Sequence, residues 1–428
     1  MKLIAKPANT ASGLALDIYS KVLDAVRADR LVGNALERVG DALFVQGQHI
    51  DLNHFNRVWI AGSGKASVSM AKAAKEILGD RLAGGLIITK SGSAEPMDGI
   101  NVLEASHPIP DQSSLDAGDR MLEFAGGLNE KDLVIYLLSG GSSAMMESLR
   151  PSLDLGDLQD TNRVLLASGA NIQAMNAIRT RLSRIKGGGL GATFAPATVV
   201  ALVLSDVVGN DLSAVGSGPF ITKPFQAPNY SQTPITQFSP AVQSLLAYDF
   251  PIPHQFNPIP HHVIGSVSLA IHAAVDACKA IGLLPLPFGD PMLGEARDMA
   301  KSILEHGVKR RRQESCMIFG GETTVTLRGT GLGGRCQEMA LAVASPMTRY
   351  LDVCFLAAGT DGADGPTDAA GGFVDPLSLF RAQDAGFSAE ESLANNDSYG
   401  FLNACDGLIF TGPTGSNVND LALFVRAS

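Results

Sequence analysis

Short apolar runs alternate with segments of helical hydrophobic spacing along the first half of the chain. The runs end in glycine or a polar turn and read "FNRVWIAGSG", "GGLIITKSG", "DLVIYLLSGG" and "ATVVALVLSDVVG". Helical stretches such as "SVSMAKAAKEIL" and "QSSLDAGDRMLEFAGGL" separate them, and residues 14–45 also carry apolar positions at helical spacing. Because strands covered on both faces read as continuous apolar runs, this alternation predicts a mostly parallel sheet with helices on both sides.

The same pattern returns after a stretch that is rich in proline. Residues 223–262 contain eight prolines, which predicts a linker or crossing. The later apolar runs read "HHVIGS", "LLPLPFG", "SCMIFGG", "LDVCFLAAGTDG" and "GLIFTGPTG". We therefore predict two α/β domains, residues 1–222 and 263–428, with mostly parallel, Rossmann-like sheets and an active-site cleft between the domains. The sequence leaves open which domain "TGPTGSNVNDLALF" packs on.

Composition and charge limit the class of protein and its partners. Hydrophobic residues make up 45% and charged residues 18% of the 428 residues, which is typical of a compact α/β protein. A net charge of -10 opposes binding to nucleic acids and anionic membranes. No signal-peptide core is present and no apolar run approaches ~18 residues, which predicts a cytoplasmic protein. A homodimer is allowed, because the sequence does not decide the oligomeric state.

The cysteines and histidines show no metal-ligand spacing. The five cysteines are far apart in the sequence and form no CxxC pair, so we expect reduced, mostly buried thiols. Structural or surface roles are expected for His107, His254, His261 and His262.

The first candidate motif is the glycine turn in "IAGSGKASVSMAKA". It comprises Gly62, Ser63, Gly64 and Lys65 and lies between an expected strand and an expected helix, whose N-terminus favours an anion. The turn is not a Walker A loop, because Trp59 and Ala66 replace required residues, and Ser67 replaces the third glycine of a dinucleotide fingerprint. A phosphate cradle and a plain turn with a solvated lysine both remain open.

A second turn and a basic segment offer further anion contacts. In "LLSGGSSAMM" the turn residues are Ser139, Gly140, Gly141 and Ser142, which supply backbone donors and hydroxyls but lack the G-x-S-x-G order of a serine hydrolase. In "RTRLSRIKGGGLG" the cations Arg179, Arg181, Arg184 and Lys186 are expected on a helix that Gly187 to Gly189 end. Each segment also has an ordinary structural interpretation: the first as a glycine turn, and the second as the end of a helix.

Acidic residues follow two expected strands. Asp206 comes directly after an apolar run and Asp211 after a glycine turn, where each could hold magnesium, accept a hydroxyl proton or cap a helix. Asp361, Asp364 and Asp368 lie among glycines in "AAGTDGADGPTDAAGG", whose order is not that of an EF-hand.

Glu322 and Arg335 belong to the motif "GGETTVTLRGTGLGGRCQEMAL". Arg335 precedes an expected helix, where a guanidinium can grip a carboxylate or phosphate through two hydrogen bonds, a surface ion pair being the alternative. Cations on glycine turns together with aspartates at strand ends suit phosphoryl transfer, which needs alignment and charge neutralisation. The residues therefore predict a small-molecule kinase.

The ordered motifs of nearly the whole chain resemble those of the class II glycerate 2-kinase family, whose C-terminal part is the MOFRL domain. They read "GSGKA", "LLSGGSSA", "LSRIKGGGL", "LSDVVGNDLSAVGSGP", "GGETTVTLRG", "GGRCQEMAL", "GTDGADGPTDAAG", "NNDSYGFL" and "TGPTGSNVNDL". The resemblance implies transfer of the ATP γ-phosphoryl group to the 2-hydroxyl of D-glycerate with Mg²⁺. Some members are labelled hydroxypyruvate reductases of tartrate utilisation, so an NAD(P)H-dependent reductase remains an alternative, as does a non-catalytic sensor of phosphorylated metabolites.

Carried over by motif, the expected catalytic residues are Lys65, Arg335, Asp206 and Asp361, with the two aspartates as metal ligands or base. Substrate or nucleotide contacts are expected at Gly62, Ser63, Gly64, Ser139, Gly140, Gly141, Ser142, Lys186, Asp211, Glu322, Asp364 and Asp368. Two positions depart from the family pattern, because Cys336 and Val267 stand where asparagine is usual.

Overall fold

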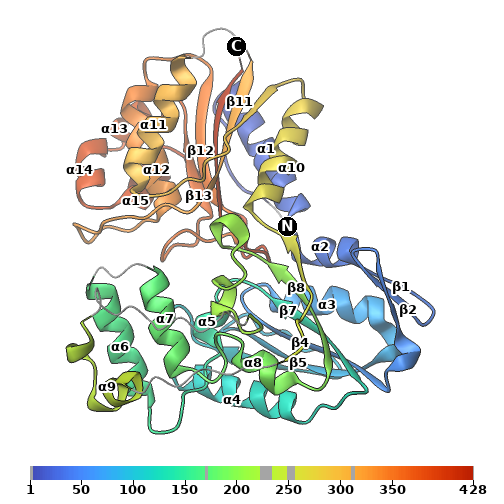
Figure 1. Ribbon diagram of the computed structural model, residues 1–428. Coiled ribbons are helices and arrows are strands. Elements are labelled where there is room, and N and C mark those ends of the chain that lie inside the picture. The colour runs from blue at the N-terminus through green and yellow to red at the C-terminus, as the bar shows by residue number, and fades with distance from the viewer. Residues whose placement is uncertain (1–2, 169–171, 222–233, 248–255, 310–313, 428) are drawn as a thin grey trace. The chain divides into compact units, whose positions relative to one another are not determined.

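The chain divides into two compact units in a computed structural model (Figure 1). The structure describes residues 3–168, 172–221, 234–247, 256–309 and 314–427. One unit comprises Ala28–Ile264, and the other combines Met1–Arg27 with Gly265–Ser428. Both are α/β units, which confirms the expected fold class.

The 28–264 unit contains a six-stranded sheet of order β6-β5-β4-β7-β8-β9. Its strands are β4 (Arg57–Ser63), β5 (Leu82–Lys90), β6 (Ile100–Ala105), β7 (Asp132–Leu138), β8 (Thr198–Leu204) and β9 (His261–Gly265). The pairings β5–β6, β4–β5, β4–β7 and β7–β8 are all parallel, as expected. The central strand β7 is buried at every residue, which explains its apolar sequence after Asp132.

Helices cover both faces of this sheet. Figure 1 shows α3 (Ser67–Leu78) on one face and α4 (Gln112–Gly126) with α8 (Gly189–Phe194) on the other. The short α2 (Ala28–Ala35) packs beside α3, and α5 (Ser142–Met145) follows β7. The expected helices after β4 and before β7 are therefore confirmed.

Residues 36–45 do not continue the helical pattern that the sequence predicts for 14–45. They form a hairpin in a small antiparallel sheet of β1 (Leu36–Val39), β2 (Ala42–Val45) and β3 (Gln48–Asp51). Gly40 makes the turn with φ +61°, and half-buried and buried side chains alternate along β2. The alternating pattern of these short strands covers too few residues to be distinguished from helical spacing in the sequence.

A separate helical cluster lies in the same unit. It contains α6 (Leu155–Ala167), α7 (Ile172–Leu182) and α9 (Pro240–Ala247), which share a buried apolar core. Residues 222–233 and 248–255 of the proline-rich stretch lie outside the described residues. The described α9 packs within the unit through Val242 and Leu246, so this part of the stretch is not a linker.

The second sheet is mixed, with strand order β10-β11-β15-β12-β13-β14. Its strands are β10 (Leu284–Pro287), β11 (Ser315–Gly321), β12 (Val353–Gly359), β13 (Gly371–Val374), β14 (Leu408–Ile409) and β15 (Asp420–Arg426). The expectation of a mostly parallel sheet is wrong here, because only β10–β11 is parallel and β15 runs antiparallel between β11 and β12. The C-terminal motif that the sequence left unplaced therefore supplies a central strand of this unit.

Helices also cover both faces of the mixed sheet (Figure 1). One face is covered by α1 (Thr10–Ala25) and α10 (Val267–Ala280). The other is covered by α11 (Ala296–Lys309), α12 (Arg335–Met347), α13 (Ser378–Asp384), α14 (Ala389–Ala394) and α15 (Ser398–Ala404).

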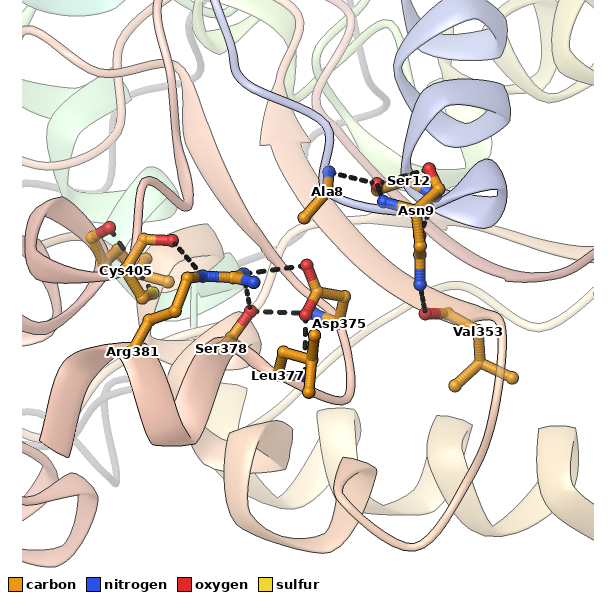
Figure 2. Close-up of polar contacts among 10 residues, drawn as sticks. Ala8, Asn9, Ser12, Val353, Asp375, Leu377, Ser378, Arg381 and Cys405 are labelled. Atoms are coloured by element: carbon orange, nitrogen blue, oxygen red, sulfur yellow. Dashed lines mark hydrogen bonds and ion pairs between the residues drawn. The ribbon is translucent and has the colours of Figure 1, made fainter. Parts of the chain in front are cut away.

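Residues 1–27 group with the C-terminal unit, whereas the sequence placed them in the domain 1–222. Figure 2 shows how Asn9 and Ser12 cap α1, while Asn9 Nδ2 donates to the carbonyl of Val353 at 3.2 Å. In the same unit, Arg381 pairs with the buried Asp375. The boundary differs because the apolar face of α1 packs on α10 and the mixed sheet rather than on the parallel one.

All five cysteines are buried free thiols, as the sequence predicts. Among the described residues, no helix has the length and apolar character needed to cross a membrane.

The central position of β15 makes its core side chains important for stability. Leu423 is fully buried, and Leu423→Ala should lower the free energy of unfolding by about 2–5 kcal/mol, measured by urea denaturation. Leu351→Ala, at a leucine that is 85% exposed, is the matched control and should change it by less than about 0.5 kcal/mol. Equal effects of the two substitutions would contradict a central role of β15.

Candidate functional site

The two predicted glycine turns of the 28–264 unit are interlocked. They follow β4 and β7, which are neighbouring parallel strands, so both turns lie at the same edge of the sheet. Lys65 N donates to the carbonyl of Gly140 at 2.9 Å, and Ser139 N donates to the carbonyl of Ser63 at 3.0 Å. Ser139 Oγ also accepts from Ala66 N at 3.1 Å. These bonds make one rigid assembly of the 62–66 turn and the 139–142 turn.

Close approach explains the glycine at position 64. It has φ +124°, and a Cβ there would lie 2.2 Å from Ser139 Oγ. Beneath the turns, Ser63 Oγ is hydrogen-bonded to Tyr136 OH at 2.8 Å and to Ser142 Oγ at 2.6 Å. Gly62 also lies against the backbone of β7, so the structure brings together all seven residues that the sequence predicts for the two turns, and Lys65.

Lys186 supports the 139–142 turn from the interior. The helix α7 ends at Leu182, so Lys186 lies beyond it and not on the helix that the sequence predicts. Its ammonium is 3% exposed, pairs with the 1%-exposed carboxylate of Glu147 and donates to the carbonyl of Ser143 at 3.1 Å. Since its charge is balanced by Glu147, the visible role of Lys186 is structural, and a contact with substrate stays a prediction.

His107 is a neighbour of the second turn that sequence reasoning missed. Gly141 has φ +83°, and a Cβ there would lie 3.1 Å from His107 Nε2. The imidazole therefore stands against the backbone of the turn. No local spacing links the two positions, so only the fold reveals the contact.

The acidic residues after β8 differ in their surroundings. Asp206 is half-buried two residues beyond the strand end. Asp211 is exposed and accepts from Ser213 N at 2.9 Å and Ser213 Oγ at 2.6 Å. Its observed contacts are therefore those of a turn cap, and its expected ligand contact stays a prediction.

In the other unit, Arg335 is the first residue of α12 and is held by two carboxylates. Its Nε and Nη2 donate to the two oxygens of Asp420, the latter at 3.0 Å, and Nη1 lies 2.8 Å from Glu322. The side chain of Asp420 is only 4% exposed, whereas that of Glu322 is half-exposed. Burial alone would lower the pKa of Arg335, but the bonds to Asp420 raise it well above its usual value.

Asp364 caps the same helix. Its carboxylate accepts from Cys336 N at 3.1 Å and Gln337 N at 2.8 Å. Burial and then the charge of Asp420 raise the pKa of Asp364 to about 7. The same burial and carboxylates raise the pKa of the Cys336 thiol, which favours the protonated form of this cysteine.

Asp361 also belongs to this acidic group. A Cβ on Gly359 would lie 3.2 Å from Asp361 Oδ1 and 3.4 Å from Asp420 Oδ1, so both carboxylates converge on this glycine. Asp368 does not join them in the observed contacts, because it is exposed and accepts from Tyr399 OH at 2.8 Å. A further neighbour is Tyr19, which the sequence did not indicate and whose hydroxyl donates to the Gly359 carbonyl at 2.7 Å.

No group of three or more His, Cys, Asp or Glu side chains in the described parts of the chain is arranged to hold a metal ion. Both oxygens of Asp364 and of Asp420 already accept hydrogen bonds. Mg²⁺ in kinases commonly takes only one or two protein carboxylates and completes its shell with phosphate oxygens and water. The acidic residues fit this type of site, and a metal role for Asp206 and Asp361 stays a prediction, as does an active-site cleft between domains.

The chain is thus a two-domain α/β protein with interlocked glycine turns in one unit and an arginine held by carboxylates in the other. Residues 14–239 match a domain of unknown function, DUF4147, and residues 315–420 match the MOFRL family. The chain belongs to the DUF4147/MOFRL glycerate kinase family, and a glycerate kinase is a small-molecule kinase.

Three similar proteins illustrate the family. The chain is 36% identical to the D-glycerate 2-kinase of Thermotoga maritima over 96% of this chain and 97% of that protein. It is also 36% identical, over 85% of this chain and 86% of the relative, to an Agrobacterium vitis protein with a provisional hydroxypyruvate reductase name. The crystal structure of a Thermotoga maritima glycerate kinase superposes with a TM-score of 0.83, at 36% identity, covering 97% of this chain and 99% of that one.

The two departures from the family pattern are both packed. Cys336 is fully buried in the apolar core between α12 and the sheet. Val267 begins α10 and lies against β11, where a Cβ on Gly320 would be 2.4 Å from Val267 Cγ2. Both side chains therefore fill space where an asparagine would need a hydrogen-bond partner.

The raised pKa of Asp364 makes stability depend on pH. An unfolded aspartate has a pKa of about 3.9, so the folded state holds this proton to higher pH. The stabilising contribution of the protonated form is therefore complete below about pH 3.9 and is lost as the pH rises through about 7.

We expect the free energy of unfolding of the wild type, minus that of Asp364→Asn, to fall from pH 5 to pH 8, by up to about 1 kcal/mol per pH unit. Urea denaturation at several pH values measures it. The control is Asp384→Asn, at an exposed aspartate of α13. A difference that stays constant over this range would show that Asp364 does not titrate there.

Proposed function

We propose that this chain is a glycerate 2-kinase that transfers the γ-phosphoryl group of ATP to the 2-hydroxyl of D-glycerate, giving 2-phosphoglycerate and ADP. The observation that carries the proposal is Arg335, fixed by the buried Asp420 at the start of α12 in a chain with full-length similarity to glycerate kinases. A guanidinium fixed in this way can pair with the carboxylate of a small hydroxy acid or with the transferring phosphoryl group.

The 62–66 and 139–142 turns supply the expected contacts to the phosphates. Backbone N–H groups at glycine turns form concave anion sites, and the α3 helix begins at Ser67, directly after the first turn. Lys65 adds a positive charge at this place. Because the two turns are tied together by hydrogen bonds, they require little reorganisation when an anion binds.

In the reaction, the 2-hydroxyl oxygen forms a bond to the γ-phosphorus while the bond from that phosphorus to the bridging oxygen of ADP breaks. The hydroxyl proton passes to a carboxylate, for which Asp206 and Asp361 are the candidates. Mg²⁺, held by one of these aspartates together with phosphate oxygens, would neutralise charge on the nucleotide. Arg335 orients the acceptor or stabilises the charge on the transferring group.

A cytoplasmic location and a homodimer accompany the proposal and stay untested.

The first test is product analysis with D-glycerate, ATP and Mg²⁺. We expect ADP to form together with a product that enolase converts directly, because enolase accepts 2-phosphoglycerate and not the 3-isomer. A parallel assay contains hydroxypyruvate and NADH. Oxidation of NADH without formation of ADP would replace the kinase proposal by the reductase alternative.

Removal of either cation should lower activity, and loss of Arg335 should also lower the free energy of unfolding because the buried Asp420 loses its bidentate partner. Lys65→Ala and Arg335→Ala should each lower kcat/KM about 10²–10³-fold, the usual loss for a preorganised charge-stabilising donor. The matched controls are Lys131→Ala and Arg349→Ala at exposed positions of the same two units, which should keep activity within about twofold. Full activity of both site variants would refute these residue roles.

A further inference from the structure

The 326–334 loop, which leads into Arg335, lies directly on residues 395–398. Its glycines allow this close approach, because a Cβ on any of four of them would clash with residues 395–398 or with Asp364. The distances would be 2.4 Å at Gly329, 2.5 Å at Gly331, 2.1 Å at Gly333 and 2.3 Å at Gly334. The motif "NNDSYGFL", which has no role in the proposed chemistry, therefore supplies the surface on which the arginine loop rests.

Asn396 makes the central contacts of this surface. Its Oδ1 accepts from Arg328 N at 2.7 Å and Gly329 N at 3.1 Å. Its Nδ2 donates to the carbonyl of Thr326 at 3.3 Å and to Glu338 Oε2 at 3.0 Å. The side-chain amide can accept two hydrogen bonds and donate two, so its full capacity is used. Asn396 is 5% exposed, and these bonds are therefore shielded from water.

The bond to Glu338 connects this surface to the helix that carries Arg335. Glu338 is 2% exposed, and its other oxygen accepts from Arg297 Nε at 2.9 Å. Positions 335 and 338 are three residues apart on α12 and are thus neighbours along one side of the helix. Asn396 accordingly holds the loop before Arg335 and the first turn of the helix after it in one fixed arrangement.

The backbone of Asn396 adds a second requirement. Its φ is +54°, in the left-handed region that asparagine, aspartate and glycine adopt most readily. Among these, aspartate has no N–H to donate and would place a carboxylate 3.0 Å from that of Glu338, and glycine has no side chain. Only asparagine therefore satisfies both the backbone conformation and the four hydrogen bonds.

We infer that Asn396 is a positioning residue for Arg335: it sets the place of the guanidinium by joining the 326–334 loop to Glu338 on α12. The inference rests on the proposed function for its kinetic consequence. Its structural consequence, a guanidinium whose position depends on Asn396, holds for any reaction at this site. Misplacement of a catalytic group by about 1 Å can lower a rate about 10²-fold, so this support matters for turnover.

The test variant is Asn396→Gly, which keeps the left-handed backbone accessible and removes only the side-chain bonds. Its matched control is Asn403→Gly on α15, an exposed position with the same change. With D-glycerate and ATP, Asn396→Gly should lower kcat about 10- to 100-fold and the control less than about twofold. Asn396→Asp should lose at least as much, since it keeps the acceptors and loses the donors.

A double-mutant cycle separates positioning from general destabilisation. In an Arg335→Lys background, Asn396→Gly should lower kcat by less than about threefold, because the group it positions is already altered. The same fold-loss in both backgrounds would show that Asn396 does not act through Arg335. If Asn396→Gly fails to fold, Asn395→Ala, which removes one bond to Thr330 N, takes its place with a smaller loss expected.

A second readout needs no substrate and keeps the inference separate from the proposed function. Phenylglyoxal labelling, followed by peptide mass spectrometry, reports the accessibility of each arginine. Labelling of Arg335 should rise several-fold in Asn396→Gly while that of the exposed Arg349 stays unchanged. Unchanged labelling at Arg335 overturns the inference, whereas absence of glycerate phosphorylation in the wild type overturns only the proposed function.

Discussion

The paired hydrogen bonds from Arg335 to Asp420 are the interaction on which the C-terminal site depends. They join the first residue of α12 to the first residue of β15, two elements that lie far apart in the sequence. Removing Arg335 would leave the 4%-exposed carboxylate of Asp420 without its bidentate partner, whereas removing Asp420 would leave a guanidinium that is 35% exposed to water. The pair therefore fixes both the guanidinium and the strand that completes the centre of the mixed sheet.

In the other unit, different interactions fix the two glycine turns at the edge of the parallel sheet. There the 62–66 and 139–142 turns are fixed by backbone bonds and by buried hydroxyls, and the buried ion pair of Lys186 with Glu147 contacts the carbonyl of Ser143, next to the second turn. Under the proposed function, neutral hydroxyls suit this place, because a fixed negative charge beneath the turns would repel a bound phosphate. The charge of Lys186 is likewise already neutralised, because Glu147 pairs with it.

The sequence predicted best what depends on local pattern. The strands β4, β5, β7 and β8 and the helix α3 were visible as apolar runs and helical spacing, and Lys65 and Arg335 were visible from their glycine neighbours. Long-range pairing was not visible: nothing local shows that β15 inserts between β11 and β12, or that α1 packs with the C-terminal unit.

The same limit applied to single residues of the site. His107, Tyr19 and Asn396 carry no motif spacing with the residues they touch, so sequence reasoning overlooked their contacts. Conversely, the charges of Asp211 and Lys186 were visible in the sequence while their contacts with Ser213 and Glu147 were not, and ligand contacts at both positions stay predictions. Charge and spacing identify candidates, but only the fold shows which charges are already satisfied.

The two carboxylates on Arg335 differ in how readily an anion can replace them. Asp420 is buried and bidentate, whereas Glu322 contributes a single contact from a half-exposed side chain. Exposed ion pairs contribute about 0–1 kcal/mol, so the contact with Glu322 is the weaker one. Under the proposed function, a substrate carboxylate or phosphoryl group would exchange with Glu322 at Nη1 while Asp420 holds the guanidinium in place. Under that proposal, Asp420 fixes the geometry of the guanidinium, and Glu322 is the partner that a substrate anion would replace.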